Sequence, residues 1–130
     1  MSEKKEFLIE TDLMIEHLTI KDGSVKSGLE IAMEIGICFT TAVNASELFF
    51  AAKTEVKQDS VKKILTALKV LGISARYSLN INEFAGKVST VRDAIICATA
   101  KINKLPILTN NPEKYKLTGL KILHPKDLRG

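Results

Sequence analysis

A chain of 130 residues is long enough for one substantial hydrophobic core and short for two domains. Its 45% apolar and 26% charged residues are typical of a globular protein, and no apolar run approaches the roughly 20 residues that span a bilayer. Aromatic residues make up only 5%, without Trp, which disfavours base stacking as the main binding device. The net charge of +4 permits a polyanionic partner, although dispersed surface lysines explain it equally well.

Two cysteines, Cys38 and Cys97, lie in apolar segments, and no spacing of cysteines and histidines fits a zinc motif. Both are expected to be buried reduced thiols, as is usual in cytoplasmic proteins. The charged amino end is not followed by a hydrophobic run of signal length. We therefore expect a cytoplasmic protein without a membrane segment, organised as one domain over residues 1–130.

Short apolar runs alternate with helical periodicity along the chain. In the first half we predict a strand at Phe7–Ile9, a helix at Thr11–Leu18, a turn and helix start at Asp22–Ser24, a strand at Ile37–Phe39 and a helix at Asn44–Lys53. In the second half we predict helices at Ser60–Leu71, Asn82–Val88 and Thr90–Asn103, and strands at Ile73–Tyr77, Pro106–Leu108 and Leu120–Leu123. This alternation predicts an α/β fold, a three-layer α/β/α sandwich with a mostly parallel central sheet.

Several acids and one amide fall where predicted strands end or predicted helices begin. They are Glu10, Asp12, Glu47, Asp93 and Asn111. In an open α/β sheet the carboxyl ends of strands and the amino ends of helices share one edge, where ligands bind. Helix capping is the alternative: Asn44 with Glu47 and Thr90 with Asp93 have the spacing of capping boxes, and Asn111 precedes a proline.

Glu10 is the residue that capping explains least well. It follows an apolar strand directly, and an unpaired carboxylate is costly to desolvate at such a position. Several carboxylates gathered at one edge repel one another unless a cation binds between them. Because Mg²⁺ and Mn²⁺ prefer oxygen ligands, the pattern indicates a divalent metal site.

Three segments together resemble a PIN domain, and most closely the small ribonuclease toxins of the VapC type. The segments read FLIETDLMIEHL from Phe7, TAVNASELFFAAK from Thr41, and RDAIICATAKINKLPILTNNPEKYKLTGLKILHP from Arg92 to Pro125. The intervening residues 54–85 match only in predicted helicity. The order and spacing of the segments are more specific than any single motif.

The resemblance assigns the four acidic positions of the family to residues of this chain. The first, which opens an Asp-Thr-Asp/Asn motif, falls on Glu10, followed by Thr11 and Asp12. The second and third fall on Glu47 and Asp93, and the fourth, which is Asn in some relatives, falls on Asn111. Glu in place of the usual Asp moves the first carboxylate by about one carbon–carbon bond.

The resemblance implies a metal-dependent endoribonuclease, the toxin of a toxin–antitoxin pair, in which Glu10, Glu47 and Asp93 are catalytic. Mg²⁺ or Mn²⁺ would be held by these three acids with Asp12 and Asn111. Thr11 and Thr109 would orient groups or cap helices, Arg92 would contact phosphate or remain solvated, and Tyr115 would pack under the last loop.

Partners and alternatives follow from the same resemblance. It implies an RNA substrate, a homodimer and a small antitoxin protein. The apolar residues Leu13, Met14 and Leu48–Phe50 belong either to the core or to a surface for such a partner. The Glu10 substitution leaves open a degenerate, non-cleaving PIN module that binds RNA or a protein. A PIN nuclease of RNA maturation or DNA processing, without an antitoxin, is a third interpretation.

Overall fold

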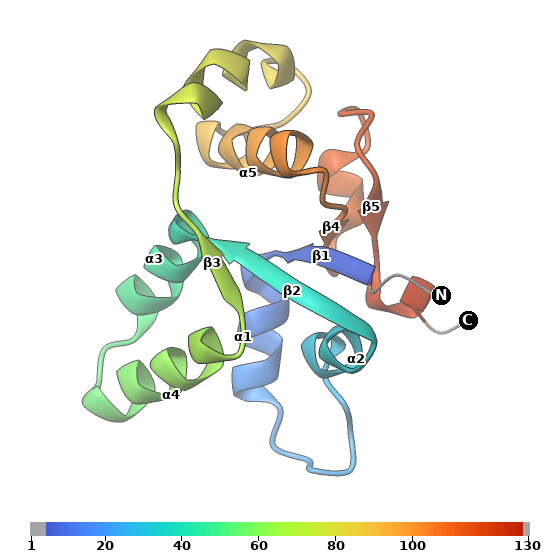
Figure 1. Ribbon diagram of the computed structural model, residues 1–130. Coiled ribbons are helices and arrows are strands. Elements are labelled where there is room, and N and C mark those ends of the chain that lie inside the picture. The colour runs from blue at the N-terminus through green and yellow to red at the C-terminus, as the bar shows by residue number, and fades with distance from the viewer. Residues whose placement is uncertain (1–4, 129–130) are drawn as a thin grey trace.

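The computed structural model describes residues 5–128; residues 1–4 and 129–130, the two ends of the predicted domain, lie outside the described range. Within that range five strands form one parallel sheet in the order β3-β2-β1-β4-β5. Helices cover both faces of this sheet, which confirms the predicted three-layer α/β/α sandwich (Figure 1).

The elements alternate along the chain as the sequence predicts for most of its length. In order they are β1 (Lys5–Ile9), α1 (Thr11–Thr19), α2 (Gly28–Ile35), β2 (Gly36–Thr41), α3 (Ala42–Ala51), α4 (Glu55–Thr66), β3 (Lys69–Leu71), the 3-10 helix η1 (Ala75–Phe84), α5 (Val91–Asn103), β4 (Ile107–Leu108), η2 (Pro112–Tyr115), β5 (Ile122–Leu123) and η3 (Pro125–Leu128). The strands predicted at Phe7–Ile9, Ile37–Phe39, Pro106–Leu108 and Leu120–Leu123 are confirmed.

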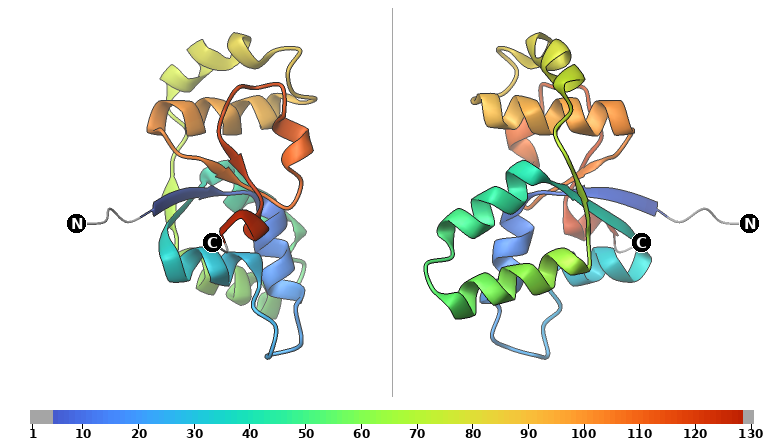
Figure 2. Two further views of the ribbon diagram at one scale, coloured as in Figure 1. Left: turned by 90° about the vertical axis from the view of Figure 1, so that its right-hand side faces the viewer. Right: turned by 60° about the vertical axis from the view of Figure 1, so that its left-hand side comes forward.

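The central strand β1 contributes side chains to two separate hydrophobic cores. Phe7 and Ile9 pack with the helices of one face, whereas Leu8 packs with Ile96 and Ile107 on the other. Successive side chains of a strand point to opposite faces, so an all-apolar run is what a doubly covered strand requires. Figure 2 shows the two layers, with α5 and η1 on one face and α1, α2, α3 and α4 on the other.

The order of the strands places a topological switch beside β1. The chain runs outward from β1 through β2 to β3, and then returns to pair β4 with the other edge of β1. Ligands of open α/β sheets bind at the carboxyl ends of strands at such a point. Glu10 follows β1 and Thr109 follows β4, so both lie at this edge.

The predictions for the middle of the chain are wrong in three places. The helix predicted at Ser60–Leu71 is α4, which begins five residues earlier because Thr54 caps it through the amide of Lys57. Its predicted last turn is instead β3, an edge strand with largely exposed side chains and hence no apolar alternation. The strand at Ile73–Tyr77 and the helix at Asn82–Val88 are replaced by η1, in which Tyr77 and Phe84 are buried in the core that includes α5.

The second helix also begins later than predicted. At the predicted start, Asp22 accepts hydrogen bonds from the amide and hydroxyl of Ser24, which closes a local turn. The helix begins only after Ser27, whose hydroxyl and amide form a reciprocal capping box with Glu30. The turn and the helix start are therefore two separate signals in the sequence.

Gly36 allows β1 and β2 to approach closely. A Cβ atom added there would lie 2.4 Å from the carbonyl oxygen of Lys5 and 2.9 Å from the Phe7 ring. We expect Gly36→Ala to lower the free energy of unfolding by about 1–3 kcal/mol through overpacking. Gly72→Ala is the matched control, because nothing lies within 4 Å of its added Cβ. Urea unfolding of both variants checks this, and equal stability would contradict a packing role for Gly36.

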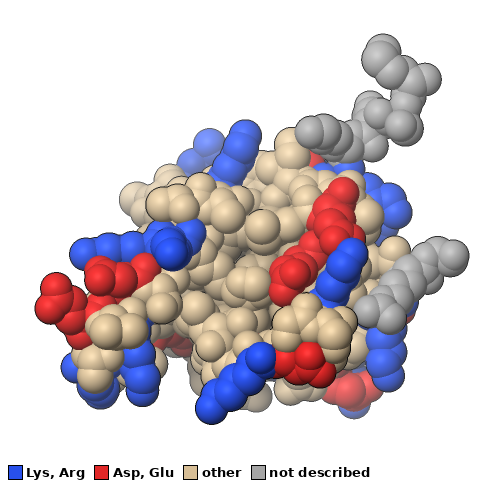
Figure 3. Space-filling view, turned by 90° about the horizontal axis from the view of Figure 1, so that it is seen from below, with Lys and Arg blue, Asp and Glu red and all other residues tan. Residues whose placement is uncertain are grey.

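Charged side chains of both signs are dispersed on the lower face of the molecule. Figure 3 shows Lys, Arg, Asp and Glu scattered around a largely uncharged central area, without a continuous basic patch on this face. This distribution agrees with dispersed lysines as the source of the net positive charge.

Candidate active site

Glu10 is almost fully buried where β1 passes into α1. The residue is the N-cap of α1, and its side chain is 3% exposed. Its Oε1 accepts a hydrogen bond from Asn44 Nδ2 at 2.9 Å, and its Oε2 accepts one from the Tyr115 hydroxyl at 2.5 Å. Arg92 donates to both oxygens, at 2.6 and 2.7 Å. Glu10 is therefore a fully engaged buried carboxylate and more than a helix cap.

Asn44 is a site residue that the sequence interpretation missed. The capping box of α3 joins Thr41 and Asn44, not Asn44 and Glu47 as predicted. Because Asn44 Oδ1 accepts from the Thr41 amide and hydroxyl, its Nδ2 is directed to Glu10 and to Thr11 Oγ1, both at 2.9 Å. The Thr41-x-x-Asn44 spacing after a strand is the signal that would have identified it.

Glu47 is free of any capping role and faces the same cluster. Its Oε1 accepts hydrogen bonds from Thr11 Oγ1 at 2.6 Å and from Arg92 Nη2 at 2.8 Å, and its Oε2 accepts from Arg92 Nε at 3.0 Å. At 40% exposure it is the most accessible of the three carboxylates that contact Arg92.

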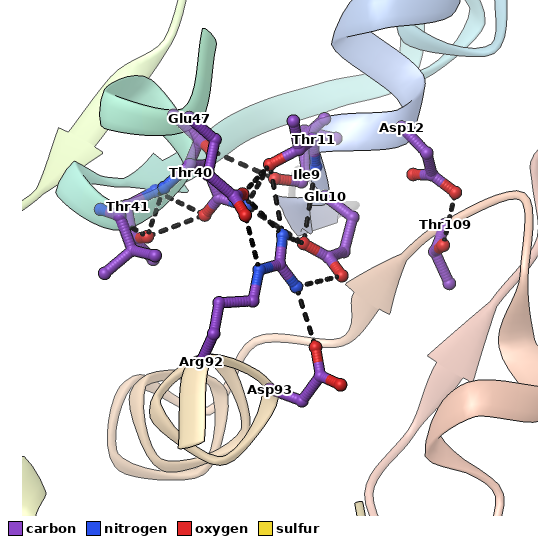
Figure 4. A network of polar contacts seen from close by, with 12 residues as sticks. Ile9, Glu10, Thr11, Asp12, Thr40, Thr41, Glu47, Arg92, Asp93 and Thr109 are labelled. Carbon is purple, nitrogen blue, oxygen red and sulfur yellow. Dashed lines mark hydrogen bonds and ion pairs between the residues drawn. The ribbon is translucent and has the colours of Figure 1, made fainter. Parts of the chain in front are cut away.

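Arg92 lies among the acids rather than in solvent. Its side chain is 23% exposed and bonds to Glu10, Glu47 and Asp93, all three of the predicted catalytic acids (Figure 4). The guanidinium also donates to Thr11 Oγ1 at 3.1 Å and to the Tyr115 hydroxyl at 3.2 Å. The solvated alternative for Arg92 is therefore wrong.

The Asp93 side chain also does not cap its helix, although its spacing from Thr90 suggested this role. Thr90 caps α5 by accepting from the Asp93 amide at 3.1 Å, and the Asp93 carboxylate binds elsewhere. Its Oδ1 lies 3.0 Å from Arg92 Nη1 and 3.0 Å from Lys114 Nζ. The residue is 2% exposed, and these two cations face its buried carboxylate.

Asp12 and Asn111 stand beside the cluster without contacting Arg92. Asp12 Oδ2 accepts from Thr109 Oγ1 at 2.7 Å and from the Asn110 amide at 3.0 Å, whereas its buried Oδ1 has no partner among the described residues. Asn111 is the N-cap residue of η2, as predicted, but its side chain makes no capping bond. Its backbone amide donates a hydrogen bond to Thr109 Oγ1.

One cavity of about 770 Å³ brings the predicted site residues together. Its lining includes Glu10, Thr11, Asp12, Glu47, Arg92, Asp93, Thr109 and Asn111, with Ile15, Ser89, Thr90 and Lys114 completing it. The sequence interpretation therefore located the residues of the cavity and missed the contacts among them. Lys114 and the buried Asn44 and Tyr115 beneath the cavity are the additions.

The electrostatics of the cluster keep Glu10 ionised. Burial by itself raises the pKa of this carboxyl, but the hydrogen bonds and charge of Arg92, the Tyr115 hydroxyl and Lys114 outweigh it and hold the pKa at about 2. The same balance lowers the pKa of Glu47: burial raises it, whereas Arg92 and Thr11 lower it by more. Burial and the nearby Glu10 charge raise the pKa of Tyr115, so its hydroxyl stays a donor.

The donor set fits Mg²⁺ or Mn²⁺ chemically. Carboxylate and amide oxygens are the ligands these ions prefer, and the unpartnered Asp12 Oδ1 is a buried acceptor that a cation would satisfy. In the described residues, however, no three acidic, His or Cys side chains already converge as a metal site. Arg92 lies between three of the carboxylates instead.

The Tyr115 hydroxyl is expected to stabilise the fold through Glu10. Tyr115→Phe removes a hydrogen bond to a buried charge, and we expect it to lower the free energy of unfolding by about 1.5–3 kcal/mol. Tyr77→Phe is a matched control, since the Tyr77 hydroxyl accepts only a neutral bond from Asn103 and its loss costs about 0.5–1.5 kcal/mol. Urea unfolding compares the two; a smaller loss for Tyr115→Phe would contradict this role.

Comparison with solved structures shows similar folds at low sequence identity. A chain in the structure of VapBC2 from Rickettsia felis, bound to a promoter DNA fragment, matches with a TM-score of 0.78 and 18% identity, over 92% of this chain and 98% of that one. VapBC-1 from nontypeable Haemophilus influenzae matches at TM-score 0.77 and 15% identity, over 93% and 98%. A toxin–antitoxin complex from Klebsiella pneumoniae matches at TM-score 0.73 and 20% identity, over 92% and 97%.

The sequence itself identifies the family. No curated protein sequence matches the chain. The PIN domain family does match it over residues 7–120, a range that includes most of β1, the lining of the cavity and β4. The family match and the shared fold together confirm the resemblance inferred from the three segments, and the chain belongs to the PIN domain family.

Proposed function

We propose that residues 1–130 form a single-domain, cytoplasmic, metal-dependent endoribonuclease, the toxin of a toxin–antitoxin pair. PIN domains are generally nucleases, and similar folds occur in solved VapBC complexes. The observation that carries the proposal is the cavity at the switch-point edge, which is lined by four acids and Asn111. None of the helices within residues 5–128 has the length and apolarity to span a membrane.

The positions of the cavity side chains support the proposed catalytic roles. Glu10, Glu47 and Asp93, with Asp12 and Asn111, would hold Mg²⁺ or Mn²⁺. A bound ion would lower the pKa of its water and neutralise charge on the scissile phosphate. Thr11 and Thr109 donate to Glu47 and Asp12, and so orient these carboxylates. The hydroxyls of Thr11 and Thr109 are committed in this way, which favours water over these two groups as the nucleophile.

Cationic groups beside the acids would bind the substrate phosphate. Lys114 is 34% exposed and lines the cavity, where the amino end of α5 also contributes Ser89 and Thr90. Helix amino termini and lysines favour phosphate through their donors and charge. The cavity therefore offers anion-binding groups next to the acids, as hydrolysis of an RNA phosphodiester requires.

An apolar groove supports the proposal of an antitoxin partner. A cavity of about 260 Å³ is lined by Ile15 and Leu18 of α1 together with residues of α3 and α4. Of the apolar residues singled out in the sequence, Leu13, Met14 and Leu48 belong to the core, whereas Phe49 is 37% and Phe50 81% exposed. An apolar groove and an exposed phenylalanine each favour a protein partner, and we propose a small antitoxin and a homodimer.

The degenerate PIN module remains the second candidate function. Two observations favour it: Glu10 replaces the usual aspartate, and Arg92 contacts Glu10, Glu47 and Asp93. In this case the cavity would bind RNA or a protein without cleaving it.

Cleavage of mixed RNA substrates distinguishes the two functions. We expect cleavage with Mn²⁺ or Mg²⁺ and none with EDTA, together with Mn²⁺ binding by calorimetry. Activity that survives chelation would contradict the metal-dependent nuclease. Neither cleavage nor metal binding would favour the degenerate module, and metal binding without cleavage would point to a specific RNA substrate.

A further inference from the structure

We propose that Arg92 is a built-in cation of the site that competes with divalent metal for Glu10 and Glu47. The inference rests on the proposed metal site and concerns how that site is regulated. The Arg92 guanidinium contacts all three predicted catalytic acids from the first turn of α5.

The guanidinium engages both oxygens of two carboxylates at once. Arg92 Nη1 and Nη2 donate to Glu10 Oε2 and Oε1, and Nε and Nη2 donate to Glu47 Oε2 and Oε1. Such paired, charge-assisted bonds are the strongest that arginine makes with carboxylates. A metal ion can use these oxygens only by displacing or sharing the guanidinium.

The opposite side of the cavity is not filled in this way. Asp12 Oδ1 is buried without a partner among the described residues, and both contacts of Asp93 with Arg92 and Lys114 fall on its Oδ1. Figure 4 shows Asp12 and Thr109 set apart from the Arg92 cluster. On one side of the cavity the carboxylate oxygens are thus occupied by Arg92, whereas on the other side Asp12 Oδ1 and Asp93 Oδ2 accept no hydrogen bond from the described residues.

The longer side chain of Glu10 fits this arrangement. Its carboxylate reaches Arg92, Tyr115 and Asn44 together, which gives it partners on each oxygen. An aspartate carboxylate would end about one carbon–carbon bond short of that position. Glu10 and Arg92 therefore form a matched pair, and the replacement of the usual aspartate is explained by its partner.

The test is Mn²⁺ binding to metal-free protein, measured by calorimetry near neutral pH. Removing a positive charge from beside a divalent ion should tighten its binding by about tenfold or more, so we expect this gain for Arg92→Gln. Lys114→Gln removes an equal charge from a more exposed residue that makes single contacts, and its gain should be smaller. The remote, exposed Arg76→Gln should leave the affinity unchanged.

The melting temperature gives a second readout, independent of cleavage. Ligands that bind only the folded state stabilise it by an amount that grows with the logarithm of their affinity, so Mn²⁺ should raise the melting temperature more in Arg92→Gln than in the wild type. If Arg92→Gln does not fold, Arg92→Lys, which lacks the planar fork, should still bind Mn²⁺ more tightly than the wild type.

The outcomes separate this inference from the proposed function. Wild-type binding of Mn²⁺ with no gain in the Arg92 variants, or an equal gain in Lys114→Gln, would overturn the competing role of Arg92 and leave the metal site intact. No Mn²⁺ binding in the wild type or any variant would overturn both.

Discussion

Asp93→Asn is expected to reduce RNA cleavage by at least about a hundredfold while the protein stays folded. The carboxylate is buried in the cavity and is one of the three proposed catalytic acids. Asparagine keeps the size of the side chain but removes the charge that faces Arg92 and Lys114. The α5 cap survives, because it uses the Thr90 hydroxyl and the backbone amide of residue 93.

The measurement is cleavage of mixed RNA in Mn²⁺, with a thermal melt to confirm folding. Glu83→Gln is the matched control: it also removes one carboxylate charge, but from an exposed pair with Lys101 outside the cavity lining. Its activity should equal that of the wild type. Full activity in Asp93→Asn would remove Asp93 from the catalytic groups and with it the main support for the metal-nuclease proposal.

The location of the candidate site at one edge of the sheet was predictable, because it depends on the order of the elements along the chain. Glu10 follows an apolar run and Asp93 occupies the first turn of an apolar helix, and parallel strands deliver both to one edge. The fold class follows from the same alternation. These features depend on local pattern and on one general rule of α/β topology, both of which a single sequence carries.

The contacts inside the cavity were not predictable in the same way. Arg92 and Glu10 are 82 residues apart, and nothing in either local segment distinguishes a buried ion pair from two solvated charges. Asn44 was interpreted as a helix cap because its spacing to Glu47 fits a capping box. In the structure Thr41 caps α3, and the side-chain amide of Asn44 donates to Glu10. Such choices are decided by three-dimensional packing and not by sequence spacing.

The predictions for the middle of the chain were wrong for a related reason. Residues 69–71 lie at an edge of the sheet with largely exposed side chains, so the strand leaves no period-two pattern. The 3-10 helix η1 exists where Tyr77 and Phe84 pack into the core that includes residues of α5. Tertiary contacts override weak local preferences in both segments.

Arg92→Ala is expected to lower the free energy of unfolding at pH 7 by about 3 kcal/mol in metal-free buffer, because Glu10 loses its main partner while remaining buried. The loss should depend on pH. In the wild type the folded-state pKa of Glu10, about 2, lies below its ordinary value of 4.5, so this carboxylate stabilises the fold above pH 4.5 and ceases to do so as pH falls towards 2.

In the variant the sign of this dependence reverses. Burial, the largest influence on this pKa, is then opposed by Tyr115, Lys114 and Asn44 without Arg92, so we expect the pKa of Glu10 to rise above 4.5 and the variant to gain stability as acid protonates it. Urea unfolding at pH 7 and pH 4 should therefore show a difference between wild type and variant that shrinks with acid. Arg76→Ala, from an exposed position, should show no difference at either pH. A difference that stays constant would mean that Arg92 stabilises the fold by packing alone; a shrinking one identifies the charge pairs of Arg92 with Glu10 and Glu47 as the stabilising interactions.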